Sequence, residues 1–344
     1  MKKLALLLSL ILGLLLAIVG CGTQPAPTEP AKQATTEPAK QTPAPAPAPA
    51  TAKPVSLVEQ VKNSGHAKLF PFMINQGPSV KNADTEHYGD GCIRCHSAVA
   101  IVDDKNAKLD DFFPGGKYAG QTEGISCRVC HVFSGKDLMT LRNKGWDVCG
   151  SCHVNSSGDP KVGSEVHHPQ YQFIQGLAVG NDVPAMPSYK YANMKDNFAC
   201  QDCHITNSQK HDFMIPGVTA TYSGKDKVKR AGTTIDYNKF AEMFNQEKCK
   251  TCHADPKPVI DKVKQEQTEI GGKLEELKKT YDEWSKKVAA MSPDQQKADQ
   301  KVKAFQNGAT FYTFVEADAS KGAHNYPYAK ALLAKAEEYW KALQ

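Results

Sequence analysis

Cys149-Gly150-Ser151-Cys152-His153 is one of five Cys-x-x-Cys-His motifs in this chain of 344 residues. The others are Cys92-Ile93-Arg94-Cys95-His96, Cys127-Arg128-Val129-Cys130-His131, Cys200-Gln201-Asp202-Cys203-His204 and Cys249-Lys250-Thr251-Cys252-His253. In such a motif two thiols can bond covalently to the vinyl groups of a haem, and the adjacent imidazole can bind the iron. Because the five copies use ten of the eleven cysteines, the sequence predicts five covalently bound c-type haems with the motif histidines as proximal ligands.

The eleventh cysteine, Cys21, follows a segment typical of a secretory signal. Two lysines precede an apolar run from Leu4 to Val19, which is the layout of a signal peptide. The run ends in Ile18-Val19-Gly20-Cys21, which resembles the bacterial lipobox, where the cysteine is lipidated and becomes the mature N-terminus. We therefore expect a signal peptide at residues 1–20 and a lipid anchor on Cys21 that holds the protein to the bilayer without spanning it. An ordinary signal peptide or an uncleaved anchor is the alternative.

Composition divides the rest of the chain into three segments. Residues 21–55 are mostly Pro, Ala, Thr, Lys, Gln and Glu, so we expect an extended tether that buries no core. Residues 56–256 carry the motifs among many Gly, Asn, Asp, Ser and Pro residues, which indicates loops and short helices around the haems. Residues 257–344 have helical periodicity. The predicted fold class is mainly α, a multihaem cytochrome c with loops and short helices around five haems and a long C-terminal helical tail.

The helical tail shows three segments with helix signals. Apolar residues step by three and four from Ile260 to Val288, which predicts one long helix with a heptad seam. Ser292-Pro293-Asp294 predicts the capped start of a second helix. A third helix is expected from about Tyr326 to Leu343. These helices either fold back on the haem-binding segment, pack only with one another, or form a homodimer interface.

The histidines outside the motifs are the candidate distal ligands. They are His66, His87, His167, His168, His211 and His324. A haem iron with two imidazoles is closed and suited to electron transfer, whereas an open sixth site can bind and transform a small molecule. Because five irons need at most five distal histidines, the sequence permits closure of every iron.

Several of these residues lie in segments that resemble the pentahaem cytochrome c nitrite reductases that form ammonia. Ser64-Gly65-His66-Ala67 is similar to the family segment whose histidine reaches the third haem, and Cys149 to Val154 is similar to the third-motif signature. His168-Pro169-Gln170-Tyr171 resembles the element with the active-site histidine. By the same resemblance His211 binds the second haem and His324 the fourth. The similarity covers most of the chain from about residue 66 onward and implies the family's fold.

The chain departs from this family at the catalytic positions. The residue that binds the first iron is His96, where family members usually have lysine. Ser156 and Glu165 stand where the family has a tyrosine and a lysine. An anionic substrate needs positive groups around its developing charge, so these replacements weaken the prediction of nitrite reduction.

Two further departures concern ligands. The histidine that precedes the fourth motif in the family, a distal ligand there, is absent, with Ala178 at about its place. His167, the neighbour of His168, is the candidate replacement. The calcium-binding glutamate of the family is Asn155 here, so a calcium ion stays a candidate cofactor with weakened support.

The first predicted function is electron transfer. Five haems would carry electrons between a membrane quinol-oxidising cytochrome, or another redox partner, and an extracytoplasmic acceptor. The protein would work as a lipoprotein on the periplasmic or outer face of the cell membrane. Under this hypothesis the distal ligands are His66, His211, His324, one of His167 and His168, and one of His87 and His168.

The second predicted function is catalysis at the first haem. His168 would be the catalytic residue, with Lys81 nearby, and the substrate would be nitrite, hydroxylamine or a related small oxyanion. A third hypothesis is a structural or filament-forming cytochrome that assembles through the helical tail. Nucleic-acid binding is not predicted, because the formal net charge of +5 is not gathered in a basic stripe with interleaved aromatic residues.

Overall fold

The computed structural model describes residues 55–78, 88–134, 137–143, 145–155, 166–179, 182–187, 199–205, 210–223, 229–245 and 247–344. They belong to one compact unit, Pro54–Gln344. The predicted signal peptide, Cys21 and all of the predicted tether except its last residue lie outside the described residues, as do Lys81, His87, Ser156 and Glu165. None of the helices in the described part of the chain combines the length and the apolar character needed to cross a bilayer.

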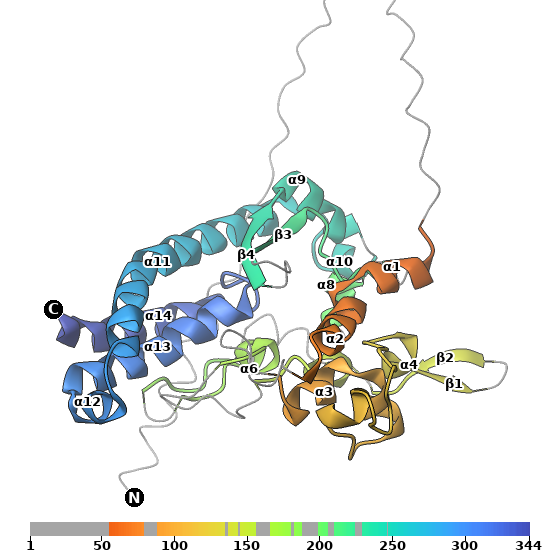
Figure 1. The fold of residues 1–344 in the computed structure, drawn as a ribbon. Helices are drawn as coiled ribbons and strands as arrows, with labels where there is room; N and C mark the ends of the chain where they lie inside the picture. Colours follow the sequence, from red (N-terminus) through yellow and green to blue (C-terminus); the bar gives the residue numbers. More distant parts are fainter. Residues whose placement is uncertain are drawn as a thin grey trace, which may run out of the picture. The chain divides into compact units, whose positions relative to one another are not determined.

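The C-terminal part of the chain consists of helices (Figure 1). They are α11 (Lys257–Ala289), α12 (Pro293–Ala298), α13 (Gln300–Asp318), α14 (Tyr326–Trp340) and the short 3-10 helix η6 (Lys341–Leu343). The predicted first and third helices are confirmed as α11 and α14. The predicted second helix is interrupted after Ala298 and forms two helices, α12 and α13. Ser292 caps only α12, and Asp299 begins α13 by accepting hydrogen bonds from the backbone N–H groups of Lys301 and Val302 at 2.7 and 3.4 Å.

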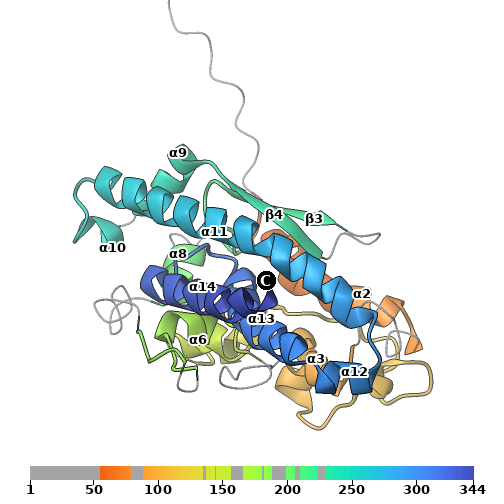
Figure 2. The same ribbon diagram turned by 90° about the vertical axis from the view of Figure 1, so that its left-hand side faces the viewer.

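Aromatic and aliphatic side chains fill the core shared by α11, α13 and α14, which lie side by side (Figure 2). Phe311 and Leu332 are completely buried. Gly308 lets α13 and α14 approach closely, because a Cβ atom there would lie 2.3 Å from Nε1 of Trp340. That Nε1 donates a hydrogen bond to the carbonyl of Phe305 at 3.1 Å. Burial of each large apolar side chain stabilises the fold by about 1.5–3 kcal/mol, so these helices have an ordinary protein core.

The first turns of α11 pack against the part of the chain that carries the motifs, residues 56–256, which we call the motif region. Val263 of α11 is buried with Phe240 of α9 (Tyr237–Phe240) and Phe244 of η5 (Ala241–Asn245). Farther along, Ile270 and Trp284 of α11 belong to the core with α13 and α14. The apolar face of α11 therefore packs into two separate cores, and the helical tail folds back on the motif region.

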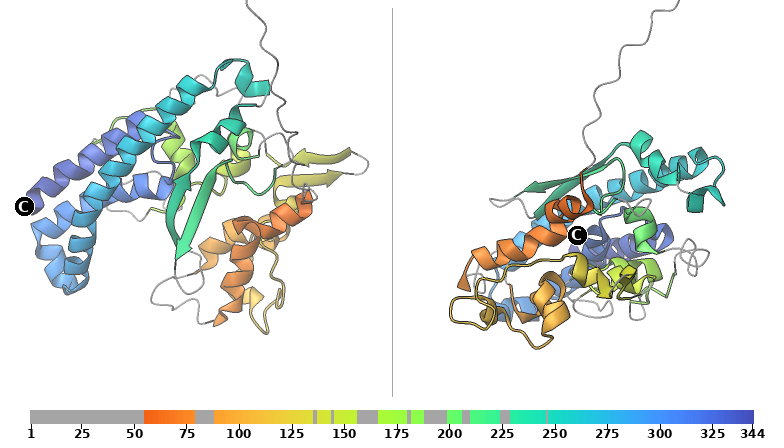
Figure 3. Two further views of the ribbon diagram at one scale, coloured as in Figure 1. Left: turned by 90° about the horizontal axis from the view of Figure 1, so that it is seen from above. Right: turned by 90° about the vertical axis from the view of Figure 1, so that its right-hand side faces the viewer.

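The motif region is built of short elements joined by loops (Figure 3). In the described residues its remaining helical elements are α1 (Leu57–Asn63), α2 (Gly65–Asn75), α3 (Asp90–His96), η2 (Val99–Asp103), η3 (Leu109–Phe112), α4 (Cys127–Cys130), α5 (Asp147–Gly150), α6 (Gln170–Gln175), α8 (Cys200–His204) and α10 (Glu247–Lys250). Two antiparallel hairpins, β1 (His131–Ser134) with β2 (Asp137–Leu141) and β3 (Val218–Ser223) with β4 (Lys229–Ile235), are absent from the sequence prediction. The β-branched residues in β3 and β4 are typical of strands, and they could have indicated the second hairpin.

Candidate functional site

Each motif lies on a short helical turn. The first motif forms the end of α3, and the second begins with α4 while its His131 is the first residue of β1. The third motif begins in α5, the fourth occupies α8, and the fifth begins in α10. In the third and fifth motifs the backbone N–H groups of His153 and His253 donate hydrogen bonds to the carbonyls of Cys149 and Cys249, at 2.8 and 2.9 Å. One helical turn places residues three apart on the same face. The two thiols of a motif therefore point to the same side, as covalent attachment of one haem requires.

Four motif histidines lie near a histidine from elsewhere in the chain. The ring centroids are 5.8 Å apart for His66 and His153, 6.2 Å for His96 and His168, 6.5 Å for His131 and His211, and 6.4 Å for His204 and His324. Two imidazoles that bind one metal ion from opposite sides have centroids about 6 Å apart, because each metal–nitrogen bond is about 2 Å and each nitrogen lies about 1 Å from its ring centroid. All four spacings fit a shared iron.

Three of these histidine pairs, all except His131 with His211, line one connected cavity of 3250 Å³ together with thiols of the motifs. Its wall includes at least one cysteine of every motif, among them Cys92, Cys130, Cys149, Cys200 and Cys249. Ordinary small-molecule pockets have volumes of about 300–1,000 Å³. Residues of the helical tail, such as Leu274, Tyr312 and His324, complete the wall. The cavity therefore has room for several haem-sized groups in contact with one another.

The imidazoles in the cavity are in the chemical form that binds iron. Burial is the largest cause that lowers the pKa of His66 and of His96 to about 4, and of His168 to about 3. The three rings are therefore neutral at physiological pH, and a neutral imidazole is the form that coordinates a metal. Protonation of these rings would place positive charges close together in a buried space.

The second nitrogen of several rings is also placed as in a metal-bound histidine. A ligating histidine usually donates its free N–H to a carbonyl or a carboxylate, which fixes the ring orientation. Nδ1 of His204 lies 3.2 Å from the carbonyl of Phe213, and Nδ1 of His324 lies 2.7 Å from Oδ1 of Asp318. Nδ1 of His153 lies 3.4 Å from Oε1 of Gln170. In these residues Nε2 is left for the iron, so the residues present fit covalently bound haem.

Thiols of different motifs touch one another. A hydrogen bond with Cys152 raises the pKa of the Cys95 thiol and lowers the pKa of Cys152 to about 7. A second bond, between Cys149 and Cys200, raises the pKa of the former and lowers that of the latter. The third motif therefore adjoins the first and the fourth. An ion pair of 2.9 Å between Asp202 and Lys248, the residue before Cys249, links the fourth and fifth motifs.

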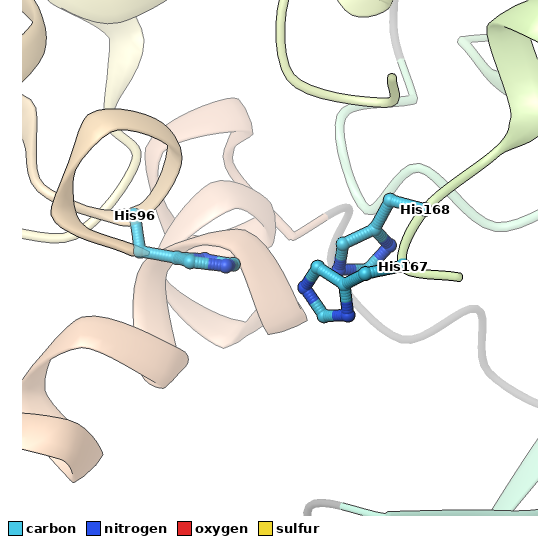
Figure 4. Close-up of side chains that lie close together, drawn as sticks. All are labelled: His96, His167 and His168. Carbon is cyan, nitrogen blue, oxygen red and sulfur yellow. The ribbon is translucent and has the colours of Figure 1, made fainter. Parts of the chain in front are cut away.

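The first motif faces two adjacent histidines (Figure 4). One ring nitrogen from each of His96, His167 and His168 lies within 4.8 Å of the others. His168 has a backbone φ of 52°, a left-handed conformation that is uncommon outside glycine. The backbone N–H of His167 donates a hydrogen bond to Oδ1 of the buried Asn155 at 2.9 Å. Asn155 thus holds the histidine pair in place.

The fifth motif has no histidine partner among the described ring contacts. The role of His167 as replacement for the distal ligand missing near Ala178 stays a prediction; in the structure a ring nitrogen of His167 lies within 4.8 Å of ring nitrogens of His96 and His168. The ring nearest to His253 in the described contacts is that of Phe244, with centroids 6.1 Å apart. The structure does not describe His87 and so does not place this remaining candidate.

Sequence reasoning missed the residues that hold the histidines. Asp318, Gln170 and the carbonyl of Phe213 contact ring nitrogens, and Asn155 positions a ligand loop. Only Asn155 was singled out, as a departure from a calcium site. Gln170 also donates a hydrogen bond to the carbonyl of Ala317, 147 residues away, at 2.9 Å. A local sequence pattern carries no signal for such contacts.

No protein-family model and no curated protein sequence matches the chain. Among solved structures, the outer cell wall cytochrome OcwA superposes with a TM-score of 0.55 and 25% sequence identity, covering 82% of this chain and 50% of OcwA. The cytochrome c nitrite reductase NrfA of Desulfovibrio desulfuricans ATCC 27774 gives a TM-score of 0.46 at 16% identity, covering 74% of this chain and 64% of that one. The chain thus spans half the length of OcwA.

The fold and the site define a mainly α multihaem cytochrome of the c type. This conclusion confirms the predicted fold class. The likeness to OcwA, the cysteine pairs and the facing imidazoles agree on covalently bound haems as the cofactors. Electron transfer is the activity that such a set of groups supports.

Proposed function

We propose that this chain is an extracytoplasmic pentahaem cytochrome that passes electrons between a quinol-oxidising partner in the membrane and an external acceptor. The observation that carries the proposal is the His96–His168 pair. Its centroid spacing of 6.2 Å lies within the range of the other three pairs, 5.8 to 6.5 Å. His168 is thus near enough to close the first iron, the one at which the family resemblance would place catalysis. Its ring also lies 5.6 Å from that of His153, but His153 has its own partner in His66 at 5.8 Å.

The contacts between motifs support a continuous path for electrons. Cys95 meets Cys152, Cys149 meets Cys200, and Asp202 meets Lys248. Haems attached at these points would be neighbours in the order first, third, fourth and fifth. The second motif joins at the third, because Cys149 and Cys152 are close enough to raise the pKa of Cys130, which burial already raises. A chain of neighbouring closed haems serves transfer over a distance better than chemistry at a single iron.

Visible and EPR spectra of the holoprotein test this proposal. Mass spectrometry should give five haems per chain, and the ferric spectrum should be entirely low-spin and unchanged by nitrite or hydroxylamine. His168→Ala should convert one haem to a high-spin form, because its sixth ligand is lost. His167→Ala tests the neighbouring ring, which also has a nitrogen within 4.8 Å of one of His96: it should leave the low-spin spectrum intact if His168 is the ligand, and a high-spin haem in this variant instead would assign the sixth site to His167. A wild-type high-spin signal that shifts on addition of nitrite would refute the closed path.

A reductase acting at the first haem is the second proposal, and the backbone of His168 favours it. A non-glycine residue at positive φ is strained by about 1–3 kcal/mol, so substrate could displace this ligand at reduced cost. Oxidation of reduced viologen on adding nitrite or hydroxylamine would support this activity. A changed rate in His168→Ala would assign it to the first haem, with an increase if the ring only blocks the iron and a loss if it also acts on the substrate. If the wild type shows no substrate-dependent oxidation, the reductase proposal fails.

Attachment to the membrane through Cys21 is proposed from the sequence. The location of OcwA in an outer cell wall, as its name states, supports a similar extracytoplasmic place for this chain. Cys21→Ala should release the protein from the membrane fraction while its haem content stays the same. Retention of this variant in the membrane would contradict lipid anchoring.

A homodimer through the C-terminal helices stays a proposal with less support. These helices bury their apolar faces within the chain. The large apolar side chains that are exposed among the described residues lie elsewhere, at Val55, Leu57, Val58, Phe133 and Leu141. Size-exclusion chromatography with light scattering tests this proposal, which a monomeric mass would contradict.

A further inference from the structure

The carboxylate of Asp318 is buried against a predicted haem ligand. The Asp318 side chain has no exposed surface, and its Oδ1 lies 2.7 Å from Nδ1 of His324. The distance is that of a charge-assisted hydrogen bond. Nδ1 is the nitrogen that does not bind iron in this arrangement, since the ring of His324 faces the ring of His204 at a centroid distance of 6.4 Å.

A small network holds this carboxylate in one position. Its Oδ2 accepts hydrogen bonds from the backbone N–H of Ser320, at 3.3 Å, and from the Ser320 hydroxyl. The same hydroxyl oxygen accepts a hydrogen bond from the backbone N–H of His324 at 3.1 Å. The carbonyl of Ser320 accepts a bond from Nε2 of Gln267 at 2.9 Å, which ties the loop to α11. The carboxylate therefore cannot turn away from the imidazole without breaking several bonds.

Helix electrostatics do not explain an aspartate at this position. Asp318 is the last residue of α13, and the C-terminal end of a helix carries partial negative charge that disfavours a carboxylate by about 0.3–1 kcal/mol. Burial of a carboxylate is also costly unless it is hydrogen-bonded. The hydrogen bond with the His324 ring offsets both unfavourable effects. We therefore interpret Asp318 as a residue that acts on this predicted haem ligand.

We propose that Asp318 lowers the reduction potential of the fourth haem by accepting the Nδ1–H bond of the distal ligand His324. This inference rests on the proposed function, in which His204 and His324 bind the same iron. A carboxylate acceptor raises the basicity of a ligating imidazole. The more basic ligand donates more charge to the iron and stabilises the ferric form over the ferrous form, and hydrogen bonding behind the ligand is an established means of tuning haem potentials.

The Nδ1 atoms of other predicted haem ligands have neutral partners or none in the described structure. Nδ1 of His204, which would bind the same iron as His324, meets the neutral carbonyl of Phe213 at 3.2 Å. Nδ1 of His153 at the third haem lies 3.4 Å from the neutral amide oxygen of Gln170. The Nδ1 atoms of His131 and His211 at the second haem are buried without a hydrogen-bond partner. A full negative charge behind the ligand distinguishes the fourth haem from these two neighbours.

Spectropotentiometric titration of the holoprotein tests this role with Asp318→Asn. The amide keeps the shape but removes the charge, so one of the haem components should become easier to reduce by tenfold or more, an upward shift of about 59 mV for a one-electron couple. The EPR signal of that component should also move. His324→Ala, which removes the distal imidazole, identifies the component that belongs to the fourth haem.

Ser320→Ala supplies a second test of opposite sign. Loss of the hydroxyl donor leaves more negative charge on the oxygen atoms of Asp318, so the potential of the fourth haem should fall. Unchanged potentials in both variants, with full haem content, would overturn the inference, and so would an equal shift of all haems. Wild-type protein without low-spin bis-imidazole signals would instead overturn the proposed function. If Asp318→Asn fails to fold, the direction of the shift in Ser320→Ala decides.

Discussion

The interior of the C-terminal helices is made of packed side chains, whereas the interior of the motif region is lined by thiols and imidazoles. Phe311, Tyr328 and Leu332 are fully buried in the core of α11, α13 and α14. The described part of the motif region has smaller apolar clusters, such as the one around Phe70 and Phe112, and it lines most of a cavity of 3250 Å³. One region can hold itself together with protein atoms, and the other depends on its cofactors for a core.

The largest expected effect is the loss of the motif region when haem is not attached. Protein made in a host without c-type cytochrome maturation should lose protection from hydrogen exchange in residues 88–134 and 145–155, because a cavity of this size would collapse or fill with water. Protection should persist in α13 and α14, whose core consists of side chains. Equal loss of protection in both regions would remove the distinction between them.

A core substitution in each region sharpens the comparison. Leu332→Ala, at a completely buried position of α14, should lower the free energy of unfolding by about 2–5 kcal/mol through lost burial and the cavity left behind. The haem spectra should not change. Urea unfolding followed by far-UV circular dichroism measures the loss.

Ile93→Ala is the matched substitution in the motif region. Ile93 is also completely buried but lies between the thiols of the first motif. A cost of similar size is expected, together with a spectral change of the first haem. If Leu332→Ala also altered the haem spectra, the two interiors would be less independent than their composition indicates.

A hydrogen bond near the first haem should matter less than either core. Asn155→Ala removes the acceptor for the backbone N–H of His167, and leaving a buried donor unsatisfied costs about 1–3 kcal/mol. Displacement of the histidine pair should change the EPR signal of the first haem only. Asn155→Asp keeps an acceptor oxygen and should preserve the signal. A change confined to another haem would contradict the assignment of His168 to the first motif.

The two regions also differ in how far the sequence predicts them. The helices α11 and α14 were predicted because their apolar spacing is a local property, and the break at Asp299 had a local signal in a capping residue. The motif turns follow from the fixed spacing of cysteines and histidine. The resemblance to a known family suggested partners for three histidines, and in the structure His66, His211 and His324 lie beside motif histidines.

The position of His167 and the roles of Asp318 and Gln170 could not be predicted. They depend on which loops meet around the haems, and contacts such as Gln170 with Ala317 join residues 147 positions apart. From the sequence alone, either of two adjacent histidines can be the ligand. Only the backbone path, with the left-handed φ of His168, places both rings near His96. Residues that support a ligand leave no pattern, since any carbonyl or carboxylate in reach can serve.

The smallest expected effect is electrostatic and concerns Arg128 in the second motif. Its guanidinium lies 2.6 Å from Glu123 and 2.7 Å from Asp103 of η2, and so ties α4 to η2. Hydrogen bonding to Arg128 holds the pKa of Glu123 below its usual value. The resulting stability is present above the ordinary pKa of a glutamate and is lost as the pH falls through the lowered value.

Glu123→Gln should therefore destabilise the protein by about 0.2–1 kcal/mol at neutral pH, the range of a solvent-accessible pair, and the difference should vanish in acid and shrink in high salt. Glu283→Gln on α11 is the matched control, because Glu283 pairs at 2.7 Å with an exposed lysine, Lys287. It should have the smaller effect, since Lys287 joins two turns of one helix, whereas Arg128 joins two elements of a region with little core. Thermal unfolding across a pH series measures both variants. A larger loss of stability in Glu283→Gln would contradict the expectation that an ion pair contributes more in the motif region than on α11.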